Sequence, residues 1–141
     1  MDYEEIERQV AVIAKENEKY LDMFEQALKD QNLSSKTIIK HLTNMDLYLN
    51  DFLCYEAPTP MQDGCIKNHS FFTWFYPRKC LFSSKTGVKE MMASLKKFYK
   101  LMLDKGFIEK DDYEMLIDEF KEYKDEYLSF YDNYDSMDDF W

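Results

Sequence analysis

The chain of 141 residues is poor in glycine and proline, with three residues of each. Both numbers lie below average usage, and the frequent turns of β-rich proteins depend on these two residues, which argues against a turn-rich β architecture. Leu, Lys, Glu, Met, Phe and Tyr are abundant instead. This composition favours an all-α fold, and the length predicts a single domain over residues 1–141.

A long hydrophobic run is also missing. No apolar stretch approaches the roughly 20 residues that cross a bilayer, and the acidic start Met1–Glu5 differs from the basic start of a secretory signal. The three cysteines, Cys54, Cys65 and Cys80, form neither an even set nor a Cys-x-x-Cys pair, a pattern typical of reduced thiols. We therefore expect a cytoplasmic protein without membrane association.

Motifs of enzyme sites are absent from the sequence, which has no glycine-rich phosphate loop and no Gly-x-Ser-x-Gly elbow. Cys54, Cys65, His69 and Cys80 together offer three sulfurs and one nitrogen. Structural zinc sites use closely spaced cysteine pairs, however, so buried free thiols are the simpler interpretation. We expect no enzymatic activity, no metal and no cofactor.

Two further groups of polar residues have structural interpretations. His41 stands beside Lys40 and Asn44 in an expected helix, which favours an exposed or capping side chain. The carboxylates between Asp111 and Glu122 are dense but lack the spacing of an EF-hand loop. The solvated face of a helix explains them.

The formal net charge of −10 is distributed unevenly along the chain. Residues 1–100 carry 14 basic and 14 acidic side chains, whereas residues 101–141 carry 4 basic and 14 acidic ones, so the last segment holds the whole excess. Within residues 67–100, eight basic side chains stand against Glu90 alone. A basic block therefore precedes an acidic block.

Apolar residues recur at spacings of three and four, which predicts a compact bundle of four main helices and one short helix. Polar residues 15–19 permit a break in the first helix, and Gly106 fits the end of the third. The stretch 56–82 is irregular, but its many aromatic rings indicate burial. The expected helices cover residues 3–30, from Ser34 or Ser35 to Tyr55, His69 to Tyr76 with Pro77 at the end, from Ser83 or Ser84 to Lys105, and from Asp111 or Asp112 onward through Phe130.

Two phrases about fifty residues apart share their pattern with a known family. The matching residues are Phe24, Leu28, Leu33, Ser34, Thr37, Ile38, Leu47, Phe52 and Leu53 in the first, and Ser94, Leu95, Phe98, Tyr99, Met102, Gly106 and Ile108 in the second. In this pattern, residues 20–108 resemble the helical, SAM-like core-binding domain of tyrosine recombinases and phage integrases. The resemblance implies a domain that clamps DNA.

The chain departs from this family after residue 108. An Asn-Pro linker leads to the catalytic half in the family, whereas here residues 109–131 form an extra acidic helix and residues 132–141 an acidic aromatic tail. Strand cleavage needs a tyrosine nucleophile among arginines, a lysine and histidines. The chain holds only Arg8 and Arg78 and no His-x-x-Arg, so we do not expect cleavage.

Under a first hypothesis, the chain is a non-catalytic module that binds double-stranded DNA through phosphate contacts. Helical spacing places several lysines near one face of the third main helix, although the solvated face of an amphipathic helix shows the same pattern. Few Arg, Asn or Gln residues stand beside them, so binding would be weak, salt-dependent and largely nonspecific. The candidate residues are Lys79, Lys85, Lys89, Lys96, Lys97 and Lys100.

Under a second hypothesis, the same scaffold is a protein-interaction or regulatory protein that has lost DNA binding. Its acidic last helix would lie against the basic third helix and cancel its field. Alternatively, the acidic aromatic C-terminus would contact a basic partner or a second copy of the chain. The aromatic candidates are Tyr131, Tyr134, Phe140 and Trp141.

Overall fold

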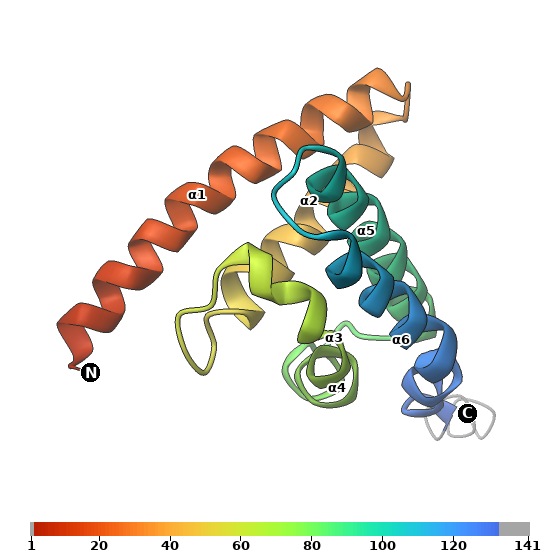
Figure 1. Cartoon of the computed structure of the whole chain (residues 1–141). Helices are drawn as coiled ribbons and strands as arrows, with labels where there is room; N and C mark the ends of the chain where they lie inside the picture. The colour runs from red at the N-terminus through yellow and green to blue at the C-terminus, as the bar shows by residue number, and fades with distance from the viewer. Residues whose placement is uncertain (1, 133–141) are drawn as a thin grey trace.

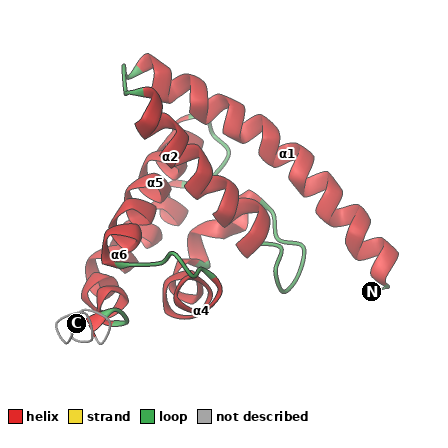
Figure 2. Cartoon of the chain, turned by 180° about the vertical axis from the view of Figure 1, so that it is seen from behind, coloured by secondary structure: helices red, strands yellow, loops and turns green. Residues whose placement is uncertain are grey.

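The computed structural model describes residues 2–132, and every regular element within them is helical (Figures 1 and 2). The prediction of an all-α bundle is confirmed. The elements in chain order are α1 (Tyr3–Asp30), α2 (Ser35–Asp46), the π-helical η1 (Leu47–Phe52), the 3₁₀-helical η2 (Met61–Ile66), α3 (Asn68–Ser70), the π-helical η3 (Phe71–Phe75), α4 (Tyr76–Lys79), α5 (Lys85–Asp104) and α6 (Lys110–Ser129).

The first helix, α1, runs without a break through its polar middle. Asn17 in that stretch is buried, and its side-chain amide donates to Oδ1 of Asn50 at 2.8 Å and to the carbonyl of Leu49 at 3.4 Å. These bonds to η1 satisfy the buried amide nitrogen of Asn17 and hold the helix against η1. Beyond them, the N-terminal half of α1 extends away from the other helices (Figure 1).

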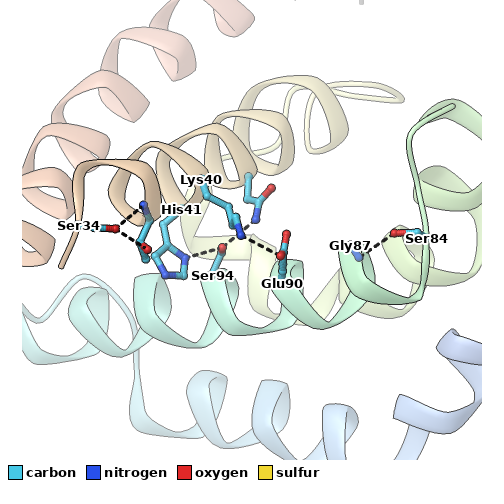
Figure 3. Close-up of polar contacts among 9 residues, drawn as sticks. Ser34, Lys40, His41, Ser84, Gly87, Glu90 and Ser94 are labelled. Atoms are coloured by element: carbon cyan, nitrogen blue, oxygen red, sulfur yellow. Dashed lines mark hydrogen bonds and ion pairs between the residues drawn. The ribbon is translucent and has the colours of Figure 1, made fainter.

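Serine side chains begin both α2 and α5. The hydroxyl of Ser34 accepts a hydrogen bond from the backbone N–H of Thr37 at 3.2 Å, and that of Ser84 accepts one from Gly87 at 3.0 Å (Figure 3). Each satisfies a backbone donor that the first turn of a helix leaves without a partner. Of the two serines expected at each start, Ser34 and not Ser35 caps α2, and Ser84 and not Ser83 caps α5.

The last helix begins at Lys110, slightly earlier than predicted. Glu109 and Asp112 cap it reciprocally, since each side chain accepts a hydrogen bond from the backbone N–H of the other residue. The preceding turn contains Gly106, whose φ of 82° lies in the left-handed region. Glycine adopts this conformation without the steric cost that a Cβ would bring.

The middle of the chain forms a longer helical run than predicted, from Asn68 through α3, η3 and α4 to Lys79. Pro77 was expected to end the helix but lies inside it. A proline cannot donate to the carbonyl four residues before it, which is that of Thr73. Here the wider π turn of η3 precedes the proline, and the guanidinium of Arg78 donates to the Thr73 carbonyl at 3.2 Å.

Most of the aromatic rings of this run are buried, as their density predicted. Phe71, Phe72, Phe75 and Tyr76 are at most 5% exposed and pack in edge and stacked contacts with each other and with rings of η1 and α6. Phe82 is an exception, because 72% of its surface is exposed. It lies in the turn between α4 and α5, beyond the core.

Two buried tyrosine hydroxyls hold η2 in place. Tyr48 donates to the carbonyl of Gly64 at 2.6 Å, and Tyr99 donates to the carbonyl of Met61 at 2.9 Å. A Cβ on Gly64 would lie 2.0 Å from the Tyr99 hydroxyl oxygen. Since Tyr99 is fully buried, its ring cannot swing away, and position 64 requires the absence of a side chain.

The cap of α5 gives a first prediction. Ser84→Ala should lower the free energy of unfolding by about 1 kcal/mol, because the N–H of Gly87 loses its partner. Ser84→Asp should retain most of the stability, since a carboxylate also accepts this bond. Urea unfolding of the three proteins measures the difference, and equal losses in both variants would contradict the capping role.

The close contact at Gly64 gives a second prediction. Gly64→Ala should destabilise the fold by about 2 kcal/mol, because the new methyl group displaces the Tyr99 hydroxyl from its buried hydrogen bond. The same substitution in a Tyr99→Phe background should cost less, since the clashing oxygen is gone. A double-mutant cycle by urea unfolding measures this coupling. Additive losses would show that the two residues act independently.

Candidate functional site

Four lysines from two helices line one groove on the protein. Lys89 and Lys96 come from α5, where seven residues separate them by about two turns. Lys121 and Lys124 come from α6, where a spacing of three places them on the same side of the helix. The groove has a volume of about 330 Å³. We call it the lysine groove, and its lining residues are Lys89, Met92, Ala93, Lys96, Phe120, Lys121 and Lys124.

The floor of the lysine groove is apolar. Met92 and Phe120 are almost fully buried, at 4% and 1% exposure, and belong to the core that joins α5 to α6. The Lys96 ammonium lies 6.0 Å from the centre of the Phe120 ring, at the outer limit of a cation–π contact. The lysine stems therefore pack on apolar surface and leave the charged ends in water.

Among residues 2–132, no carboxylate lines the lysine groove, although α6 is rich in acidic residues. Glu119 lies on another side of α6, where it accepts a hydrogen bond from the hydroxyl of Tyr127 at 3.2 Å. That hydroxyl also lies 3.1 Å from Nδ1 of His69. Burial raises the pKa of Glu119, and this hydrogen-bonded chain provides polar partners for its half-buried carboxyl. Glu119 thus contacts a different part of the protein from Lys121 and Lys124.

The remaining lysines proposed for DNA lie elsewhere. Lys97 and Lys100 line a groove of about 240 Å³ between α5 and α1. The Lys97 ammonium donates to the side chain of Gln31 at 3.4 Å, and Lys100 pairs with Asp104 at 3.1 Å. This second groove therefore contains a carboxylate beside its lysines.

Two further candidates lie toward the start of α5. Lys79 places its ammonium 5.4 Å from the ring centre of Tyr55 and 5.5 Å from a ring of Trp74. Lys85 forms an ion pair with Asp132 at 2.7 Å. Of the six predicted lysines, the structure brings only Lys89 and Lys96 together in the lysine groove.

Sequence reasoning missed Lys121 and Lys124 because they belong to the segment with a strong acidic excess. Their spacing of three within a predicted helix was the signal that could have found them. Helix α6 does lie along α5, as the second hypothesis expected (Figures 1 and 2). The groove between them, however, is lined by lysines of both helices.

The aromatic candidates for a partner contact include one clear correction. Tyr131 is 5% exposed and belongs to the hydrophobic core, so it is not available on the surface. The reason is that Tyr131 follows Tyr127 by four residues and so continues the buried row of Leu116, Phe120 and Tyr127 just past the end of α6. Tyr134, Phe140 and Trp141 lie outside the described residues.

The four residues considered above as an alternative zinc site, Cys54, Cys65, His69 and Cys80, are not grouped around a metal position in residues 2–132, the part of the chain that the structure describes. Within it, no group of three or more His, Cys, Asp or Glu side chains is placed to hold a metal ion. Cys54, Cys65 and Cys80 are free, and Cys65 and Cys80 are buried. Burial raises the pKa of the Cys65 thiol to about 12, which keeps it protonated at neutral pH.

A second polar cluster joins α2 to α5 (Figure 3). His41 was expected to be exposed or capping, but it is 7% exposed, and its Nδ1 lies 2.7 Å from the hydroxyl of Ser94. The side-chain amide of Asn44 donates to the same hydroxyl at 3.0 Å, and Lys40 pairs with Glu90 at 2.9 Å beside them. The approach of α5 buries this face of α2, which the sequence of α2 alone does not reveal.

Comparisons with known proteins identify no relative. No protein-family model, no curated protein and no solved structure matches the chain. None of the helices within residues 2–132 has the length and apolar character needed to cross a membrane.

The buried histidine gives a third prediction. Burial first, and then the charges of Lys97 and Lys40, lower the pKa of His41 below its ordinary value, while Glu90 acts in the opposite sense. The unfolded chain therefore binds a proton at a higher pH than the folded protein. The contribution of His41 to the free energy of unfolding should be fully present above about pH 6.5 and should be lost progressively as the pH falls below that value.

Urea unfolding of the wild type and His41→Gln at pH 7.5 and 5.5 measures this contribution. The loss of stability between the two pH values should be smaller in the variant, which has no imidazole to protonate. Comparing each protein with itself removes any constant cost of the substitution. An identical pH dependence in both proteins would show that His41 does not contribute.

Proposed function

We propose that the chain is a non-catalytic module that binds double-stranded DNA through the lysine groove. The observation that carries this proposal is the convergence of Lys89, Lys96, Lys121 and Lys124 from two helices on one groove, to whose lining the described part of the chain contributes no carboxylate. Like charges held together repel, and an anion that enters the groove relieves that repulsion. The groove therefore favours a ligand that carries several negative charges.

A nucleic-acid backbone meets this requirement. Its phosphates follow one another at regular spacing, and lysines that neutralise them release condensed counterions, which drives binding. The resemblance of residues 20–108 to the core-binding domain of tyrosine recombinases supports the same proposal, because α5 contains most of the second matching phrase. In the chain described here, α6 adds two lysines to the contribution of α5.

The composition of the groove favours contacts to phosphate over the reading of bases. Lysine presents a compact ammonium on a flexible stem, whereas base edges are usually recognised by the planar donors of Arg, Asn or Gln. Within the described residues 2–132, none of these three residue types lines the lysine groove. Binding should accordingly be nonspecific, and its strength should depend strongly on salt.

The net charge of −10 restricts where DNA can dock. Exposed acidic side chains on α6, among them Asp118, Glu122 and Asp125, repel a phosphate backbone. DNA is therefore held on the one face where lysines gather. The same acidic surface supports a second candidate function, the binding of a basic protein partner, and that function would not require the lysine groove.

Fluorescence anisotropy of a labelled duplex tests the DNA proposal. If about four phosphates are neutralised, the association constant should fall about 100-fold between about 50 and 200 mM salt. Lys89→Gln with Lys96→Gln should weaken binding at low salt and reduce the magnitude of the logarithmic salt slope by about 2. Both side chains are exposed, so the fold should persist.

Lys97→Gln with Lys100→Gln is the matched control. It removes the same charge from the same helix, but from the side that faces α1. Its effect on affinity and on the salt slope should be clearly smaller. Equal effects of the two double variants would mean that total charge, and not the lysine groove, governs binding. No binding by the wild type at low salt would favour the protein-partner function.

A further inference from the structure

The turn between α4 and α5 exposes two adjacent apolar side chains. Leu81 is 101% exposed and Phe82 is 72% exposed. Burying a side chain of this size in an apolar environment stabilises by roughly 1.5–3 kcal/mol. A ligand that covered these two side chains would therefore gain binding free energy. We call these two residues the apolar tip.

The apolar tip belongs to an ordered turn. The backbone N–H of Ser83 donates to the carbonyl of Cys80 at 3.0 Å, which closes the turn around both residues. Cys80 is 5% exposed and anchors the turn in the core, while Ser84 caps α5 immediately after it. The Phe82 ring also contacts the edge of Tyr76, with ring centres 6.2 Å apart. The turn therefore holds both side chains outward before any ligand arrives.

Basic residues surround the apolar tip in the sequence. No acidic residue occurs between Lys67 and Lys89. Arg78 and Lys79 precede the tip, and Lys85 follows it, although Lys85 is paired with Asp132. An apolar side chain among positive charges fits a surface that offers both phosphates and an apolar interior.

The turn that carries the apolar tip leads directly into α5, one of the two helices that line the lysine groove. α5 begins directly after the turn and carries Lys85, Lys89 and Lys96 along its length. Eleven residues of helix separate Lys85 from Lys96, about 16 Å, which is the length of about five base pairs. A short duplex laid along α5 therefore spans the distance from Lys96 to the start of the helix, which directly follows the turn.

We propose that the apolar tip is a wedge that enters between base pairs of a DNA duplex whose phosphates lie in the lysine groove. This inference rests on the proposed function. Leu and Phe side chains of minor-groove proteins act in this way, and they unstack one base step and kink the duplex by tens of degrees. Flexible pyrimidine–purine steps such as TA resist this least, so the wedge should prefer them.

A duplex suits these two features better than a lipid surface does. A concave groove accepts a protruding phosphate strand, whereas the headgroups of a bilayer form a broad plane that cannot enter it. Stacked bases also provide an apolar interior only a short distance from the phosphates. An anionic membrane is the competing occupant, and the experiment includes it.

Energy transfer between dyes at the two ends of a 20-base-pair duplex with a central TA step tests the wedge. Wild-type protein should raise the transfer efficiency as the duplex bends. Leu81→Asn with Phe82→Asn should not bend the duplex. It should bind DNA with the salt slope of the wild type and with an affinity within about threefold of the wild type, because the contacts that it loses are offset by the unstacking that it avoids. Leu81→Met with Phe82→Leu should restore bending.

Each outcome of this experiment bears on the wedge. Bending by the asparagine variant equal to that of the wild type would overturn it, as would DNA binding without bending by the wild type. Lys89→Gln with Lys96→Gln should weaken binding and bending together. A wild type that binds no DNA would overturn the proposed function and the wedge with it. If the protein sediments with phosphatidylserine vesicles only when the apolar tip is intact, and does not bend DNA, the tip is a membrane contact and not a wedge.

Discussion

The fold depends on the hydrogen bonds by which two buried tyrosines hold an irregular stretch of backbone. Tyr48 of η1 and Tyr99 of α5 donate to carbonyls of η2. A buried hydroxyl left without a partner costs about 1–3 kcal/mol, so these bonds hold η2 against η1 and α5. Gly64 lets the Tyr99 hydroxyl approach closely enough. The core therefore combines apolar packing with a small number of obligatory polar contacts.

The position of η2 also determines the position of the next segment of the chain. The run from Asn68 to Lys79 packs its aromatic rings against η1 and α6, and the Arg78 guanidinium compensates for the missing N–H of Pro77. The turn after this run leads directly into α5, the helix that contacts α1, α2 and α6. The irregular part of the sequence thus determines where the most central helix begins and where the apolar tip projects.

Four lysines that lie in differently charged parts of the sequence gather at one groove in three dimensions. α6 has an acidic excess, yet Lys121 and Lys124 turn toward Lys89 and Lys96 of α5, while Glu119 contacts His69 and Tyr127 elsewhere. A protein with a net charge of −10 can in this way present a local anion-binding surface. The proposed DNA contact depends on this separation and not on the average charge of either helix.

The sequence by itself determined the properties that depend on near neighbours along the chain. Its apolar spacing and capping residues predicted the helices and the caps at Ser34 and Ser84, because both follow from bonds within a few residues. It could not group Lys121 with Lys96, bury His41, or separate Lys97 from the lysine groove. Only the tertiary structure decided these points, because each depends on which faces of helices distant in sequence pack together.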